Sequence, residues 1–116
     1  MISDIVREQC FYYTSCSLTF ELLSKHPSTN QRILSERDTH RLNAILSTSG
    51  MYDQSGEFAF TVGLPAKSGV GGGVVAIIPG TGVIAAWSPP LNFRGNSVRG
   101  LKMVKHLSKK LGLSLF

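Results

Sequence analysis

The sequence has no long unbroken apolar run, only two cysteines, and no acidic residue after Glu57. Its longest apolar stretch, residues 69–87, is interrupted by Pro79-Gly80-Thr81-Gly82, and such breaks do not fit a membrane-spanning helix. Cys10 and Cys16 are six positions apart in a predicted helix, where they cannot form a disulfide, and no His or Cys cluster has metal-ligand spacing. These absences argue against a membrane segment, a disulfide scaffold, and a metal or other cofactor. They favour a cytoplasmic protein, or a mitochondrial one if the chain belongs to a longer precursor.

Basic charge is concentrated in the second half of the chain. The 116 residues are 42% hydrophobic and carry a formal charge of +5, which indicates one globular domain or part of one. Most of the excess lies in or beside the last predicted helix, at Arg94, Arg99, Lys102, Lys105, Lys109 and Lys110. That helix lacks interleaved aromatic residues and any nucleic-acid motif. A solvated face that complements the helix dipole is therefore favoured over a nucleic-acid site.

Three helices are expected from apolar periodicity and capping residues. One covers residues 2 to about 23, before a cluster of turn formers. A second runs from Glu36 to about Ser47, with Ser35 and Asp38 at capping-box spacing and Gly50 in the left-handed conformation after its end. The third runs from Ser97 to about Leu111, capped by Asn96 and ended by Gly112.

Three strands are expected between the second and third helices. Residues 58–62, Phe-Ala-Phe-Thr-Val, have strand composition. Residues 69–78 and 83–87 are β-rich runs joined by a turn, which predicts an antiparallel hairpin. Both runs are apolar on successive residues, so both faces of the sheet should be covered. The predicted class is α+β, an antiparallel sheet flanked by helices.

Residues 63–73 contain the most informative local pattern, a lysine and a hydroxyl in front of glycines. In Lys67-Ser68-Gly69-Val70 the missing side chain at Gly69 lets a ligand approach the backbone. A phosphate loop is excluded, because the lysine precedes the glycines and a strand follows. On these residues alone, a flexible strand entry with a solvated lysine is the better interpretation.

Five segments, read together, resemble successive signature segments of the serine-dependent glutaminases, in the same order and spacing. They are Gly50-Met51-Tyr52-Asp53, Ser55-Gly56-Glu57-Phe58, residues 63–69, Trp87-Ser88-Pro89-Pro90-Leu91 and Gly95-Asn96-Ser97-Val98. The resemblance implies a β-lactamase/transpeptidase-like fold. It also implies hydrolysis of L-glutamine to L-glutamate and ammonia through an acyl-enzyme on the serine of a Ser-x-x-Lys motif.

No Ser-x-x-Lys motif occurs in this sequence, because none of its lysines has a serine three positions before it. The nucleophile would have to come from another stretch of polypeptide. The resemblance therefore implies that the chain is the carboxyl-terminal portion of a single glutaminase domain, and that it is inactive alone.

The resemblance assigns two catalytic roles. Tyr52 matches a tyrosine that shuttles protons between the nucleophile, the leaving ammonia and the incoming water. A phenol does this at neutral pH only with a nearby cation, which the absent Ser-x-x-Lys lysine would supply. Val70 matches the position whose backbone N–H completes the oxyanion hole. The structural alternatives are a buried tyrosine that satisfies a hydrogen bond and an ordinary core valine.

Further positions are implied to bind substrate or line the site. Tyr12 matches a substrate-binding tyrosine, with the adjacent Tyr13 as the alternative register. Lys67, Ser68 and Gly69 resemble the Lys-Thr-Gly strand of β-lactamases and are predicted to line the site.

One departure from the family is a missing segment, because about a dozen residues of a helix are absent near positions 18–31. Besides the hydrolase, this leaves open an inactive fragment that binds other chains through exposed apolar surface. The partners implied are L-glutamine and further copies or a complete glutaminase, without nucleic acid or membrane.

Overall fold

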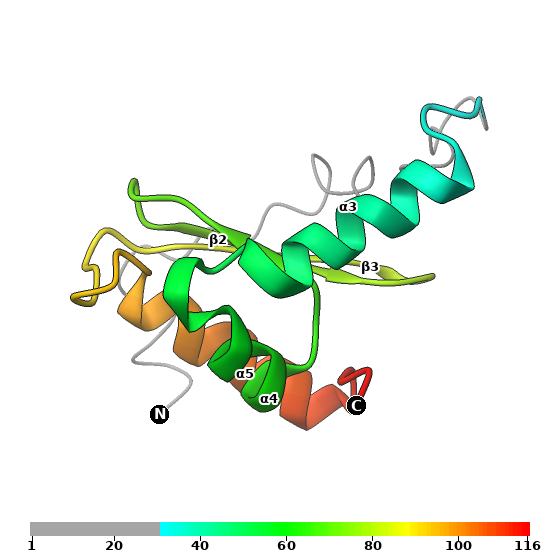
Figure 1. The fold of residues 1–116 in the computed structure, drawn as a ribbon. Helices are drawn as coiled ribbons and strands as arrows, with labels where there is room; N and C mark the ends of the chain where they lie inside the picture. The colour runs from blue at the N-terminus through cyan, green and yellow to red at the C-terminus, as the bar shows by residue number, and fades with distance from the viewer. Residues whose placement is uncertain (1–30) are drawn as a thin grey trace.

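The computed structural model describes residues 31–116 (Figure 1). Helix α3 (Glu36–Ser49) leads through the 3₁₀ turn η1 (Tyr52–Gln54) into helix α4 (Ser55–Val62). Strands β1 (Ala66–Ser68), β2 (Gly73–Ile78) and β3 (Gly82–Trp87) follow, and helix α5 (Val98–Leu111) is the last element. The helix expected at residues 2–23, with Tyr12, Tyr13 and both cysteines, lies outside the described residues.

The three strands form one antiparallel sheet in the order β1-β2-β3. The predicted hairpin is confirmed: Gly73 pairs with Trp87 at one end and Ile78 with Gly82 at the other. Its first strand begins at Gly73 rather than Gly69, because residues 69–72 turn back on themselves. In that turn Gly72 N–H donates to the Gly69 carbonyl at 2.9 Å, and Gly69 N–H donates to the Gly73 carbonyl at 2.9 Å.

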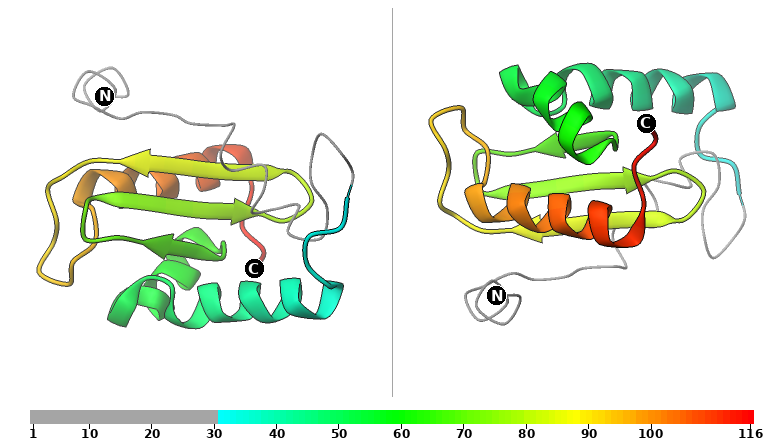
Figure 2. Two further views of the ribbon diagram at one scale, coloured as in Figure 1. Left: turned by 90° about the horizontal axis from the view of Figure 1, so that it is seen from above. Right: turned by 90° about the horizontal axis from the view of Figure 1, so that it is seen from below.

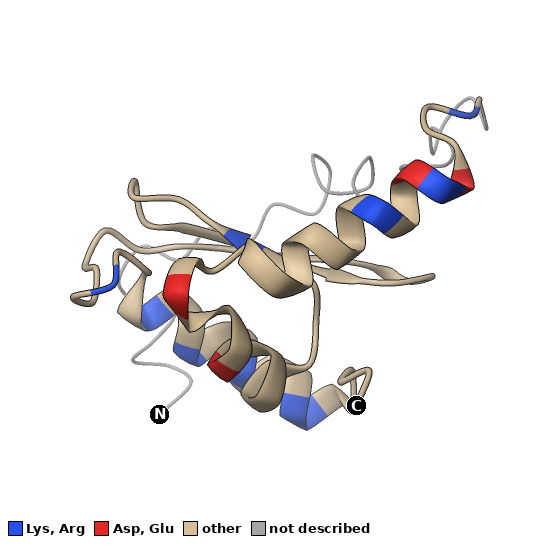
Figure 3. Ribbon diagram, in the orientation of Figure 1, with Lys and Arg blue, Asp and Glu red and all other residues tan. Residues whose placement is uncertain are grey.

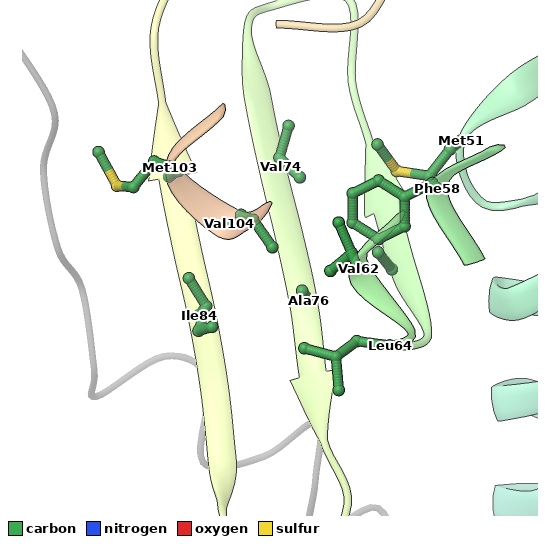
Figure 4. Close-up of a cluster of buried hydrophobic side chains, with 11 residues drawn as sticks. Met51, Phe58, Val62, Leu64, Val74, Ala76, Ile84, Met103 and Val104 are labelled. Atoms are coloured by element: carbon green, nitrogen blue, oxygen red, sulfur yellow. The ribbon is translucent and has the colours of Figure 1, made fainter. Parts of the chain in front are cut away.

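Helices α4 and α5 lie on one face of the sheet, and α3 runs along its β1 edge (Figure 2). Alternate strand residues point toward α4 and α5, and the buried core lies between these layers (Figure 4). Its largest members are Met51, Phe58, Val62, Leu64, Val74, Ile84, Met103 and Val104. Within residues 31–116 the helices thus cover one face of the sheet, whereas cover was expected on both.

The strand expected at residues 58–62 is wrong, because these residues form the second half of α4. Phe58 and Val62 are four positions apart, so a helix brings both into the core, while Phe60 between them is 90% exposed. Gly63 ends the helix in the left-handed conformation at φ 70°, and its N–H donates to the Phe58 carbonyl. Burial of one helical face outweighs the strand propensity of the individual residues.

Helix α3 begins as predicted and ends differently. Asp38 N–H donates to the Ser35 hydroxyl at 3.1 Å, and that hydroxyl donates to the Asp38 carboxylate at 2.7 Å. Gly50 is right-handed, with φ −71°, so the expected left-handed end is wrong. Position 50 requires glycine for steric reasons, because a Cβ there would lie 1.7 Å from the Ala66 carbonyl oxygen.

Helix α5 is capped by Ser97 rather than by Asn96. The Ser97 hydroxyl accepts from Gly100 N–H at 3.1 Å and donates to the Ser88 carbonyl at 2.8 Å. Gly112 ends the helix at φ 63°, as predicted. Asn96 is thereby left free to turn its side chain into the interior beneath η1.

Candidate functional site

Tyr52 holds a backbone conformation that side-chain-bearing residues rarely adopt. Its φ is 53°, and it is the one non-glycine residue with positive φ among residues 31–116. Such a conformation costs about 1–3 kcal/mol and persists only where its surroundings hold it. The Ser55 hydroxyl accepts from Met51 N–H at 3.0 Å and donates to the Tyr52 carbonyl at 2.8 Å. Both sides of the strained residue are therefore fixed by one side chain.

A buried polar cluster connects this turn to β1. Asn96 is fully buried, and its amide donates to the Met51 carbonyl at 3.1 Å and to the Gln54 side chain at 2.7 Å. Its amide oxygen accepts from the Ser68 hydroxyl. Asn92 also donates to the Gln54 side-chain oxygen, at 2.7 Å. Four polar side chains thus fix the Tyr52 turn against the end of β1.

The turn at residues 69–72 presents Val70 to solvent. The Val70 side chain is 72% exposed, and no hydrogen bond of the described residues uses its N–H. The end of β3 holds the turn in place, because Ser88 N–H donates to the Gly72 carbonyl at 2.9 Å and the Trp87 indole donates to the Gly71 carbonyl at 2.8 Å. The amide of Val70 is therefore outside the ladder of the sheet.

Tyr52 contacts Lys67, and both Tyr52 and Val70 lie close to Gly95. The Lys67 ammonium lies 4.8 Å from the centroid of the Tyr52 ring. A Cβ built on Gly95, whose φ is 83°, would lie 3.7 Å from the Tyr52 ring and 3.9 Å from the Val70 side chain. Tyr52 as a whole residue is 42% exposed. A tyrosine, a cation and an unpaired backbone donor thus share one open surface at the end of the sheet.

The other residues expected to line the site divide into two groups. Lys67 is exposed and contacts Tyr52, and Gly69 is half-buried beside Val70. Ser68 is buried and its hydroxyl faces Asn96, so it reaches the site only through the polar cluster. Tyr12 lies outside the described residues.

Sequence reasoning gave the residues that support this site no role in it, and Asn96 was expected only to cap the last helix. Gln54, Trp87, Asn92 and Asn96 all position it through hydrogen bonds. Two of them were visible as members of the segments around residues 87–91 and 95–98. The sequence of those segments could not show their contacts, because the Asn96 side chain forms hydrogen bonds with residues 28 to 45 positions away.

Charge and cavities elsewhere in residues 31–116 point to no second reactive centre. Lysines run along the exposed side of α5 (Figure 3). A cavity of about 160 Å³ between α4 and α5 is lined by Gln54, Glu57, Lys102 and Lys105 together with apolar side chains. Arg94 pairs with Glu57 at 3.3 Å. The described residues contain no cluster of three metal-ligating side chains and no helix with the length and hydropathy of a membrane span.

Solved structures define the class of this fold. The probable glutaminase YbaS is 46% identical, with a TM-score of 0.78 over 84% of this chain and 32% of that one. The Bacillus subtilis glutaminase YbgJ, in covalent complex with 5-oxo-L-norleucine, is 31% identical, with a TM-score of 0.82 over 89% of this chain and 38% of that one. The α+β sheet and helices are therefore part of a β-lactamase-like fold, as the sequence predicted.

Sequence comparison gives the family. A profile of the family Glutaminase matches residues 6–116. A glutaminase of Shewanella baltica is 44% identical over 122 residues, covering 97% of this chain and 40% of the relative, and one of Pseudomonas fluorescens is 44% identical over 113 residues, covering 97% and 35%. The chain belongs to the glutaminase family, and it spans about two fifths of the length of these relatives.

Proposed function

We propose that this chain is the carboxyl-terminal portion of one glutaminase domain, with a shortened segment near residues 18–31, and that the complete site hydrolyses L-glutamine to L-glutamate and ammonia. The proximity of Lys67 to Tyr52, and of Tyr52 and Val70 to Gly95, carries this proposal. The serine nucleophile comes from polypeptide outside this sequence, which contains no Ser-x-x-Lys.

The first half of the reaction forms an acyl-enzyme. The serine oxygen attacks the side-chain amide carbon of glutamine, and the carbonyl oxygen becomes an oxyanion that accepts a hydrogen bond from Val70 N–H. Tyr52 takes the serine proton and delivers it to the departing nitrogen, so that ammonia leaves and an ester remains. The lysine of the Ser-x-x-Lys motif supplies the cation near the phenol in this exchange, and Lys67, 4.8 Å from the centroid of the Tyr52 ring, lines the site.

The second half hydrolyses the ester. A water gives its proton to Tyr52 while its oxygen attacks the ester carbon, and the same Val70 N–H stabilises the second oxyanion. Collapse of this intermediate breaks the ester bond, returns the proton to the serine and releases glutamate. The covalent 5-oxo-L-norleucine complex of YbgJ supports a covalent intermediate, since that ligand has a carbonyl where glutamine has its side-chain amide.

The test uses a chimera in which this chain replaces the matching segment of the Shewanella baltica glutaminase, with ammonia release from glutamine as the readout. We expect turnover by the chimera and none by the isolated chain. Tyr52→Phe should lower kcat by at least about 100-fold, as loss of a general acid–base does. An active isolated chain, or an active Tyr52→Phe chimera, would contradict the assigned roles.

Val70 provides a matched pair of variants in the same chimera. Val70→Ala keeps the backbone N–H and should leave kcat within about twofold of the chimera. Val70→Pro removes the N–H and should lower kcat by about 100- to 1,000-fold, the usual effect of one oxyanion donor. Equal loss in both variants would show that the side chain, not the amide, matters.

A second candidate function is assembly with other chains, and exposed aromatic residues favour it. Phe60, Phe93 and Phe116 are each about nine-tenths exposed on this part of the domain. The candidate partners are further copies or a complete glutaminase. Co-purification with the full-length Shewanella baltica enzyme, lost in Phe60→Ser, would support it, and a monomer at all concentrations would contradict it.

A further inference from the structure

Two peptide groups connect the Trp87 indole to the Val70 amide. The indole N–H donates to the Gly71 carbonyl at 2.8 Å, and that carbonyl shares a planar peptide group with Gly72 N–H. Gly72 N–H donates to the Gly69 carbonyl at 2.9 Å, and that carbonyl shares a peptide group with Val70 N–H. The hydrogen bonds therefore run in one direction, donor to acceptor, and end at Val70.

This connection has a directional and an electrostatic effect. In a trans peptide the C=O and N–H bonds point to opposite sides, so the bond to the Gly69 carbonyl turns Val70 N–H away from the centre of the turn. Each donor also polarises the peptide group that accepts from it, by about 10–30% per bond. A polarised amide is a stronger donor toward a developing negative charge.

The setting of Trp87 favours a polar role over a packing role. The residue is 38% exposed and does not belong to the buried core cluster. The next residue holds the turn as well: Ser88 N–H donates to the Gly72 carbonyl, and a Cβ on Gly72, at φ 91°, would lie 2.4 Å from the Ser88 carbonyl oxygen. The turn thus has little freedom to move away from the indole.

We propose that Trp87 is a positioning residue that orients and polarises the Val70 amide through the Gly71–Gly72 and Gly69–Val70 peptide groups. This connection, which we call the relay, is a property of the turn alone. Its effect on catalysis rests on the proposed function. Trp87 acts through its N–H and does not touch the substrate.

The direct test replaces the donor and leaves the shape. Trp87 is the single tryptophan of the sequence, so incorporation of 3-benzothienylalanine, with sulfur in place of the N–H, changes this site alone. In amide spectra of the chain we expect the Gly72 and Val70 protons to shift upfield and Gly72 to exchange several-fold faster. Thr81 N–H, bonded to the Ile78 carbonyl at the other end of the hairpin, is the internal control and should not move.

Unchanged Val70 and Gly72 resonances in the analogue would overturn the relay, whether or not the protein is a glutaminase. In the chimera, Trp87→Phe should lower kcat by about three- to tenfold with little change in KM, since the donor acts on the transition state. A raised KM at unchanged kcat would assign Trp87 to substrate binding instead. If the unmodified chimera has no activity, the proposed function fails and the spectra still decide the relay.

Discussion

Two regions of this molecule contain fully buried side chains and are held together in different ways. Between the sheet and helices α4 and α5, Val74 and Val104 are fully buried among apolar side chains. Beneath η1, Asn96 is as deeply buried, but it is held by hydrogen bonds to the polar side chains of Ser68 and Gln54. Apolar packing stabilises without strong directional preference, whereas hydrogen bonds fix directions. The polar cluster therefore sets the geometry of the site, and the apolar core sets most of the stability.

The largest expected effect lies in the apolar core. Phe58→Ala should lower the free energy of unfolding by about 3–5 kcal/mol, because it removes a buried ring and leaves a cavity. Phe60→Ala is the matched control, two positions away on the exposed side of the same helix, and should change it by less than about 0.5 kcal/mol. Urea unfolding followed by circular dichroism measures both, and similar losses would contradict the placement of α4.

A smaller effect is expected in the polar cluster. Asn96→Ala leaves the Ser68 hydroxyl and the Met51 carbonyl without their buried partner, at a cost of about 1–3 kcal/mol. The Ser68→Ala and Asn96→Ala pair should show a coupling energy of at least about 0.5 kcal/mol in a double-mutant cycle of unfolding. Strictly additive losses would mean that the cluster does not act as a unit.

The smallest effect is a difference in stability between two variants at position 52, in which glycine is expected to be the better residue. Tyr52→Gly should be more stable than Tyr52→Ala by about 1 kcal/mol, because glycine adopts a φ of 53° without steric cost. Both variants lose the phenol, so thermal unfolding compares the backbone alone. Equal stability of the two would indicate that the left-handed conformation at position 52 carries no strain.

The sequence predicted the elements whose signals are local. Ser35 and Gly112 mark their helix ends correctly, and the turn formers after Ile78 mark the hairpin. The prediction was wrong at residues 58–62, where strand-prone residues form a helix because Phe58 and Val62 bury one face. It was also wrong at Gly50, where the need for glycine comes from Ala66, a residue distant in the sequence.

The candidate site was predictable only as far as the family resemblance reaches. It named Tyr52 and Val70, which the fold brings to one surface beside Gly95. It could not name Asn96 or Trp87 as supports, because their side chains bond to residues 16 to 45 positions away in the sequence, which come close only when the chain folds. Burial of an asparagine is not visible in composition, since asparagine is usually exposed.

The large sequence separation between Asn96 and its hydrogen-bond partners has a consequence for the order of folding. The carbonyl before Tyr52 finds its partner 45 residues later, so the strained turn gains that contact only after the hairpin and the start of α5 are in place. Contacts of such sequence separation form late, because the intervening loop must first be closed. Loss of Asn96 should therefore speed unfolding more than it slows refolding, and the end of the sheet beside Tyr52 would be among the last parts of the newly made chain to become ordered.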